Sequence, residues 1–88
     1  MTILEPIADT RVRTVTPDNE RLSVELMDGR EIAVPLAWYP RLVRASPAER
    51  SNSQIAGGGY GIHWPDIDED MSTEGLLRGA PSPELKRT

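Results

Sequence analysis

The sequence of 88 residues has no cysteine and no phenylalanine, and it holds one histidine and one lysine. Without cysteine, a disulfide framework and a thiolate metal site are both excluded. No apolar run approaches the roughly 20 residues of a membrane-spanning helix, and the N-terminus lacks the basic start and apolar centre of a signal peptide. We therefore expect a cytoplasmic protein with no contact with a membrane.

The short chain sets the domain organisation. A domain of this size buries only about 60% of the surface that its unfolded chain exposes, so it has little spare stability. Association with another protein or with a second copy of the chain is therefore expected. We predict an N-terminal arm over residues 1–8, a single domain over 9–79 and a flexible tail over 80–88, which contains Pro81 and Pro83.

The charge balance argues against nucleic acid as a direct ligand. Ten basic residues stand against fourteen acidic ones, for a net charge of −4, whereas a duplex-binding protein normally presents a basic face. Seven arginines among residues 1–56 leave an arginine-bearing face open. The acidic excess favours a basic protein as the partner.

A β-hairpin is the clearest local structure. Apolar residues alternate in two neighbouring segments, which is typical of half-buried strands: Leu22, Val24 and Leu26, then Ile32 and Val34. Asp28-Gly29 invites a two-residue loop, but that register would place Leu26 opposite Glu31. A three-residue loop over 27–29 aligns the two apolar faces and predicts a left-handed conformation for Gly29.

The remaining elements follow from periodicity and capping signals. In chain order they are a strand over 11–16 before the hairpin, a helix over 37–45, a helix over 46–53 capped by Ser46 with Glu49 three residues on, a strand over 60–64 and a helical turn capped by Ser72. The order β-β-β-α-α-β-α predicts an α+β fold, a small antiparallel sheet with short helices on one face.

The segment 57–72 concentrates glycines, the histidine and four acidic residues. Its glycines lead into a predicted strand, whereas a phosphate loop leads into a helix, so a tightly turned or flexible connection is the stronger interpretation. The acidic run 66–70 resembles the start of a calcium loop, but Met71 and Leu77 replace the glycine and glutamate that complete one. A solvated acidic edge is therefore the stronger interpretation, and a divalent ion held by Asp66, Asp68 or Asp70 with His63 is the alternative.

His63 suits general acid–base chemistry, but a nucleophile would have to be a serine such as Ser46, Ser51 or Ser72, none of which lies in a nucleophile elbow. We therefore assign no catalytic residue, no cofactor-binding residue and no metal ligand. Tyr60 and Trp64 are aromatic residues of the kind that anchor interfaces. For Trp64 a place in the core is the stronger interpretation, whereas for Tyr60 core and interface are evenly balanced.

Four stretches of the sequence resemble one family of small bacterial proteins, the domain-of-unknown-function family 2442. They are residues 22–30, 35–42, 58–70 and 75–77. The resemblance covers about residues 9–79 and implies a small α+β domain with no established catalytic residue or cofactor. Members of the family are often encoded beside another small protein, an arrangement that resembles toxin–antitoxin pairs. Some carry an added helix-turn-helix; we expect none within these 88 residues, which argues against direct binding of DNA.

Two hypotheses about function follow. The first is a non-catalytic protein-interaction module, an antitoxin-like member of a two-gene pair, that binds a basic protein or a second copy of the chain. Its candidate interface consists of Tyr60, His63, Trp64, Asp66, Asp68 and Asp70. The second is an enzyme or metal-dependent protein that uses His63 and the acidic run.

Overall fold

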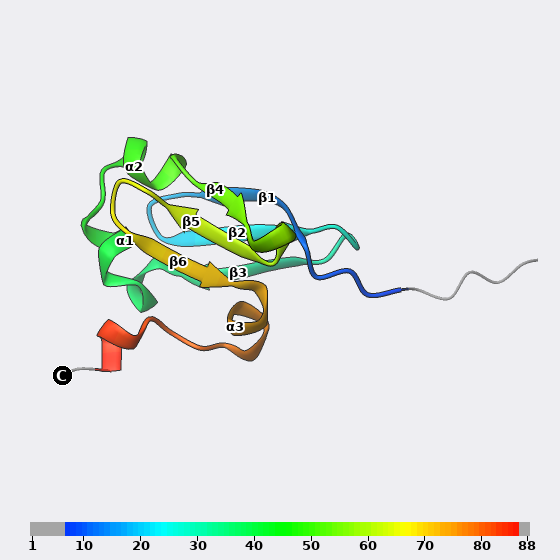
Figure 1. Ribbon diagram of the computed structural model, residues 1–88. Helices are drawn as coiled ribbons and strands as arrows, with labels where there is room; N and C mark the ends of the chain where they lie inside the picture. Colours follow the sequence, from blue (N-terminus) through cyan, green and yellow to red (C-terminus); the bar gives the residue numbers. More distant parts are fainter. Residues whose placement is uncertain (1–6, 87–88) are drawn as a thin grey trace, which may run out of the picture.

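The computed structural model describes residues 7–86, which form two small antiparallel sheets packed face to face (Figure 1). The first sheet has the order β1-β2-β3, with bounds Val12–Pro17, Arg21–Leu26 and Glu31–Pro35. The second has the order β4-β5-β6, with bounds Gln54–Ala56, Gly61–Trp64 and Glu69–Ser72. The predicted α+β class is therefore confirmed, with the strands divided between two sheets.

Three short α-helices lie at the ends of the two sheets, where they follow the predicted order. They are α1 (Pro40–Arg44), α2 (Pro47–Ser51) and α3 (Thr73–Arg78). Short 3-10 turns cover Leu36–Trp38, Gly57–Gly59 and Pro83–Lys86. Within residues 7–86, no helix is long and apolar enough to cross a membrane.

The hydrophobic core lies between the sheets. Leu22, Val24 and Leu26 of β2 and Ile62 and Trp64 of β5 are all buried in one cluster. Their alternation along each strand places them on the inner face, as the period of two requires. Trp64 is the largest fully buried side chain, and its indole N–H donates to the carbonyl of Arg50 at the end of α2 (2.9 Å).

The predicted three-residue hairpin loop is confirmed. Leu22 pairs with Val34 and Val24 pairs with Ile32. The amide of Gly29 donates to the carbonyl of Leu26 (3.0 Å), and Gly29 has a φ of 94°. This register puts the apolar side chains of both strands on one face, as the sequence pattern demands.

The helix predicted over 37–45 is interrupted at Tyr39. A 3-10 turn precedes Tyr39 and α1 follows it, while Tyr39 itself has φ −131° and ψ 87°. Pro40 is the reason, because a proline disfavours the helical conformation of the residue before it. The predicted caps are confirmed: Ser46 and Glu49 form a capping box, and the hydroxyl of Ser72 accepts from the amide of Gly75 (3.0 Å).

Residues 80–86, which we expected to belong to a flexible tail, lie against the domain. The amide of Ser82 donates to the carbonyl of Trp38 (3.0 Å), and the Tyr39 hydroxyl donates to the carbonyl of Ala80 (3.3 Å). Ser82 is buried. The extended chain that the two prolines favour can follow the edge of the core and meet these partners. Of the predicted N-terminal arm, residues 1–6 lie outside the described residues, as do residues 87–88 of the tail.

Asp28 joins the hairpin loop to the segment before β1. Its carboxylate accepts from the amide of Asp9 (2.9 Å) and from the guanidinium of Arg30 (2.8 Å). The Arg30 hydrogen bonds, followed by those from the two backbone amides, hold the pKa of Asp28 far below its usual range. The charged form of Asp28 is therefore favoured by folding.

Replacing Gly29 with valine should lower the free energy of unfolding by about 1 kcal/mol or more, because a β-branched residue is strained at positive φ. Nothing crowds this position, so the loss should reflect backbone strain and not a clash. Urea denaturation measures it, and Gly29→Asn is the matched control, since asparagine tolerates the left-handed region better. Equal losses in the two variants would contradict this explanation.

Replacing Asp28 with asparagine should destabilise the protein at pH 7, and the gap from the wild type should close in acid. The pKa of Asp28 is lowered by folding, so its contribution is present above the unfolded value, near 3.8, and is lost as the pH falls below it. Thermal unfolding of both proteins between pH 2 and pH 7 measures the gap. A gap that stays constant over this range would contradict the assignment.

Candidate functional site

The outer face of the second sheet is the face turned away from the core. Strand register places its side chains in two rows: Gln54, His63 and Asp70 in one, Ala56, Gly61 and Ser72 in the other. In Figure 1 no described helix crosses this face. We use the name outer face for these six residues. Most of them are small or polar, so the face is shallow and can be approached closely by another surface.

His63 and Asp70 are brought together on the outer face. The Nδ1 atom of His63 lies 2.7 Å from Oδ1 of Asp70, its cross-strand neighbour. Their side chains are 32% and 73% exposed. A carboxylate in this position orients an imidazole ring. The nearby Ser72 hydroxyl already accepts the Gly75 amide as the cap of α3, so it is committed to a structural role.

The other acidic candidates point to different partners. Asp66 accepts a hydrogen bond from the side chain of Asn52 (2.9 Å). Asp68 has a positive φ of 51° in the β5–β6 turn, and its carboxylate lies 3.9 Å from Arg41. Among residues 7–86, no three His, Asp or Glu side chains gather where they could hold a metal ion. Of the three aspartates in the acidic run, Asp70 therefore pairs with His63, while Asp66 and Asp68 have other partners.

The two aromatic candidates have opposite positions. Trp64 is fully buried, which corrects its place in the predicted interface: its parity in β5 points it into the core. Tyr60 is 53% exposed, and Leu77 in α3 is 45% exposed. Tyr60 and Leu77 line a groove of about 560 Å³ at the end of β5 opposite the acidic turn. Of the two aromatic candidates, only Tyr60 can contact a partner.

The three glycines before Tyr60 form the tightly turned connection that the sequence favoured. Gly57, Gly58 and Gly59 all have positive φ. A Cβ atom on Gly59 would lie 3.0 Å from the side chain of Arg11. Glycine is therefore favoured at this position by its backbone conformation, and any other residue would also displace the Arg11 side chain. The connection brings the chain back into β5.

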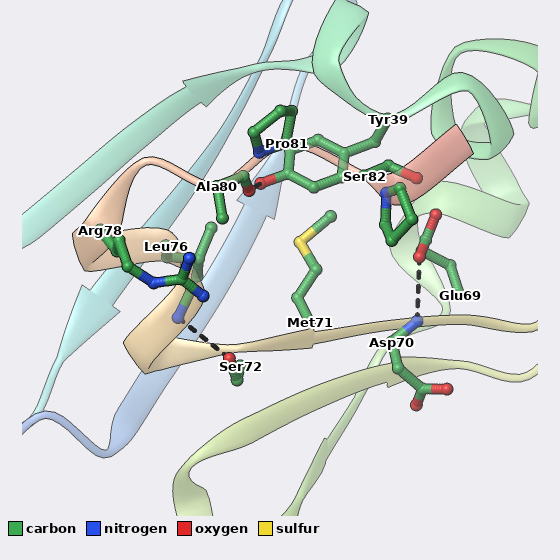
Figure 2. Close-up of a pocket in the computed structure, with 12 residues that line it drawn as sticks. Tyr39, Glu69, Asp70, Met71, Ser72, Leu76, Arg78, Ala80, Pro81 and Ser82 are labelled. Atoms are coloured by element: carbon green, nitrogen blue, oxygen red, sulfur yellow. Dashed lines mark hydrogen bonds between the residues drawn. The ribbon is translucent and has the colours of Figure 1, made fainter. Parts of the chain in front are cut away.

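Sequence reasoning missed Glu69, which is buried at the edge of the core (Figure 2). Its Oε1 atom accepts from the amide of Asp70 (3.2 Å), while Oε2 has no hydrogen-bond donor among the described residues. Burial raises the pKa of Glu69, and burial likewise raises that of the Tyr39 hydroxyl, with the Glu69 charge adding to it. Had β6 been recognised, its period of two would have turned Glu69 and Met71 inward.

Glu69 lines two cavities. The smaller, of about 210 Å³, also has apolar walls from Met71, Leu76 and Pro81. The larger, of about 620 Å³, also has polar walls from Arg41, Arg44 and Glu84. Glu84 lies 2.5 Å from Arg41 and 3.6 Å from Arg44. Glu69 therefore lies at the boundary of both spaces.

The comparisons with known proteins identify relatives of unknown function. A family model described as protein of unknown function (DUF2442) matches residues 12–82. A crystal structure of a protein of unknown function from Rhodospirillum rubrum is similar, with a TM-score of 0.75 and 30% identity, over 89% of this chain and 96% of that one. The solution NMR structure of an uncharacterized protein from Chromobacterium violaceum is also similar. Its TM-score is 0.71 and its identity 23%, over 82% of this chain and 68% of that one. No curated protein matches significantly.

Replacing Glu69 with glutamine should stabilise the protein relative to the wild type increasingly as the pH rises. The pKa of Glu69 is raised by folding, so its contribution is fully present below the unfolded pKa and is lost as the pH rises through the folded one. Arg41, Glu84 and Asp70 are the charged groups around it. Chemical denaturation of both proteins from pH 4 to pH 8 measures the difference, and a difference independent of pH would contradict a buried carboxylate.

Proposed function

The chain belongs to the DUF2442 family of proteins of unknown function, and we propose that it acts as a non-catalytic protein-interaction module. The observation that carries the proposal is the uncovered outer face, which runs between exposed Tyr60 and the acidic β5–β6 turn. A sheet face with small residues admits another protein surface closely, and a tyrosine at its end provides an anchor with few rotatable bonds.

The charges beside the outer face favour a basic partner. The side chains of Asp68 and Asp70 are 90% and 73% exposed. The whole chain carries a net charge of −4, so the acidic turn adds to a field that attracts cations. Complementary charge of this kind speeds association more than it strengthens the final complex. The partner is therefore a protein with Lys or Arg side chains on its contact surface.

We extend the proposal to an antitoxin-like member of a two-gene pair. A protein that acts by covering another small protein needs a binding surface and no chemistry. The His63–Asp70 pair and the acidic run, on which an enzyme or metal-dependent protein would rely, meet at a single hydrogen bond. The outer face thus supports binding better than catalysis.

The test replaces Asp68 and Asp70 together with asparagine, which removes two negative charges, and asparagine tolerates the positive φ at position 68. The protein that co-purifies with the wild type from its native cell is the binding partner. Its association rate with the variant should fall severalfold at low salt, and the rate should depend less on ionic strength. Stopped-flow or surface-plasmon measurements at several salt concentrations record both.

The matched control is Glu20→Gln with Glu31→Gln, which removes the same charge beside the first sheet. It should change the association rate less than the Asp68 and Asp70 variant does. Tyr60→Ala should raise the dissociation rate, because it removes the anchor. If the only associating species is a second copy, sedimentation should show the same order of effects. Equal association rates for the wild type and the Asp68 and Asp70 variant would refute this surface.

A further inference from the structure

We propose that Glu69 forms the floor of a pocket that receives the ammonium or guanidinium group of a Lys or Arg side chain from the partner protein. The inference rests on the proposed function and states what one part of the interface recognises. Glu69 lies between the acidic residues of the turn and the outer face, but its side chain points to the opposite side of β6. Because β6 is an edge strand, a partner that passes around it can reach both sides.

The first observation is an unmet hydrogen-bond acceptor. Glu69 is 9% exposed, and its Oε2 atom has no donor among residues 7–86. A buried carboxylate without a full set of donors is costly to the folded state. Groups of this kind are concentrated at sites that bind or react. Glu69 therefore has the capacity to accept one more strong hydrogen bond.

The second observation is that the neighbouring arginines are engaged elsewhere. Arg41 binds Glu84 through Nε (2.5 Å) and also donates to the carbonyl of Asp68. Arg44 lies 3.6 Å from Glu84. Three carboxylates, those of Glu69, Glu84 and Asp68, thus surround two guanidinium groups. The local charge is negative, which favours a cationic ligand.

The third observation is the size and lining of the space. Of the two cavities beside Glu69, the larger measures about 620 Å³, and the smaller measures about 210 Å³, which is below the roughly 300 Å³ at which small-molecule sites begin. The smaller cavity is the one that we assign to the basic side chain. Its walls include Met71, Leu76 and Pro81, along which the aliphatic stem of that side chain can pack, and Arg78, whose guanidinium is paired with Glu74 (2.9 Å). A single side chain therefore suits the space better than a cofactor does.

A divalent metal ion fits the same residues less well. Calcium takes six to eight oxygen ligands, and magnesium demands a near-octahedral set. Within residues 7–86, no three His, Asp or Glu side chains are arranged so that they could hold a metal ion. An ammonium group needs fewer acceptors than a metal ion does, and Glu69 provides a carboxylate at the end of an apolar wall.

The experiment uses n-butylammonium and n-butylguanidinium as probes for the two side chains. Each is titrated into the ¹⁵N-labelled full chain at pH 7 and constant ionic strength, with n-butanol as the neutral control of equal stem length. We expect saturable shifts of the amides at Glu69, Asp70, Met71 and Ser82 with both cations, and none with butanol. Absence of saturation, or equal shifts with butanol, would overturn the proposal.

Two variants identify the carboxylate. Glu69→Gln should weaken binding of the probes by about tenfold or more, since a hydrogen bond to a charged group is lost. Glu31→Gln removes the same charge from an exposed position of β3 that lines neither cavity, and it should keep the wild-type affinity. Wild-type affinity in Glu69→Gln would overturn the proposal. Calcium that shifts these amides where both organic cations fail would overturn it as well.

The affinity of the wild type for the probes is also measured over a pH series. This test uses no variant, so it does not depend on whether Glu69→Gln folds. The groups that face Glu69 are Tyr39, Arg41, Glu84 and Asp70. Binding of the probes should weaken as acid protonates Glu69, and affinity independent of pH would count against the pocket. The pocket and the proposed function fail separately, because the pocket is judged by the probes and the function by association rates of the Asp68 and Asp70 variant.

Discussion

The two sheets must share one core, and this constraint organises the whole molecule. A three-stranded sheet in water needs a packed apolar face to be stable, and β4, β5 and β6 are only three or four residues long. Trp64 supplies much of the volume between the sheets, and its indole N–H is satisfied by the carbonyl of Arg50. That single hydrogen bond also ties the end of α2 to the core.

The shared core decides which residues are available for function. The inner positions of the second sheet, among them Ile62, Trp64 and Met71, are committed to packing. The intervening positions, which carry His63 and Asp70, are left on the outer face. The acidic turn cannot act as one cluster, because Asp66 and Asp68 are held by different neighbours. The binding function that we propose is consistent with this distribution.

Among the charged residues of segment 57–72, only Glu69 points toward the core that the two sheets share. Its position at the sheet edge leaves it beside residues 80–86, which complete the walls of the smaller cavity through Pro81 and Ser82. The C-terminal segment is therefore part of the site. Its attachment through Tyr39 and Trp38 links the geometry of the pocket to the interrupted helix after β3.

Local patterns determined much of this protein. The alternation of apolar residues determines the β2–β3 register, and the three-residue loop requires a positive φ at Gly29. The side-chain caps Ser46 and Ser72 set the starts of α2 and α3. These features depend on residues close in the sequence, so the sequence alone predicts them. It also indicated the family and the acidic, glycine-rich segment. It did not reveal β4 and β6, which are too short to show a period and exist because β5 lies between them. The burial of Trp64, the isolation of the acidic side chains and the pocket at Glu69 likewise depend on contacts between distant segments, which only the packing of the two sheets decides.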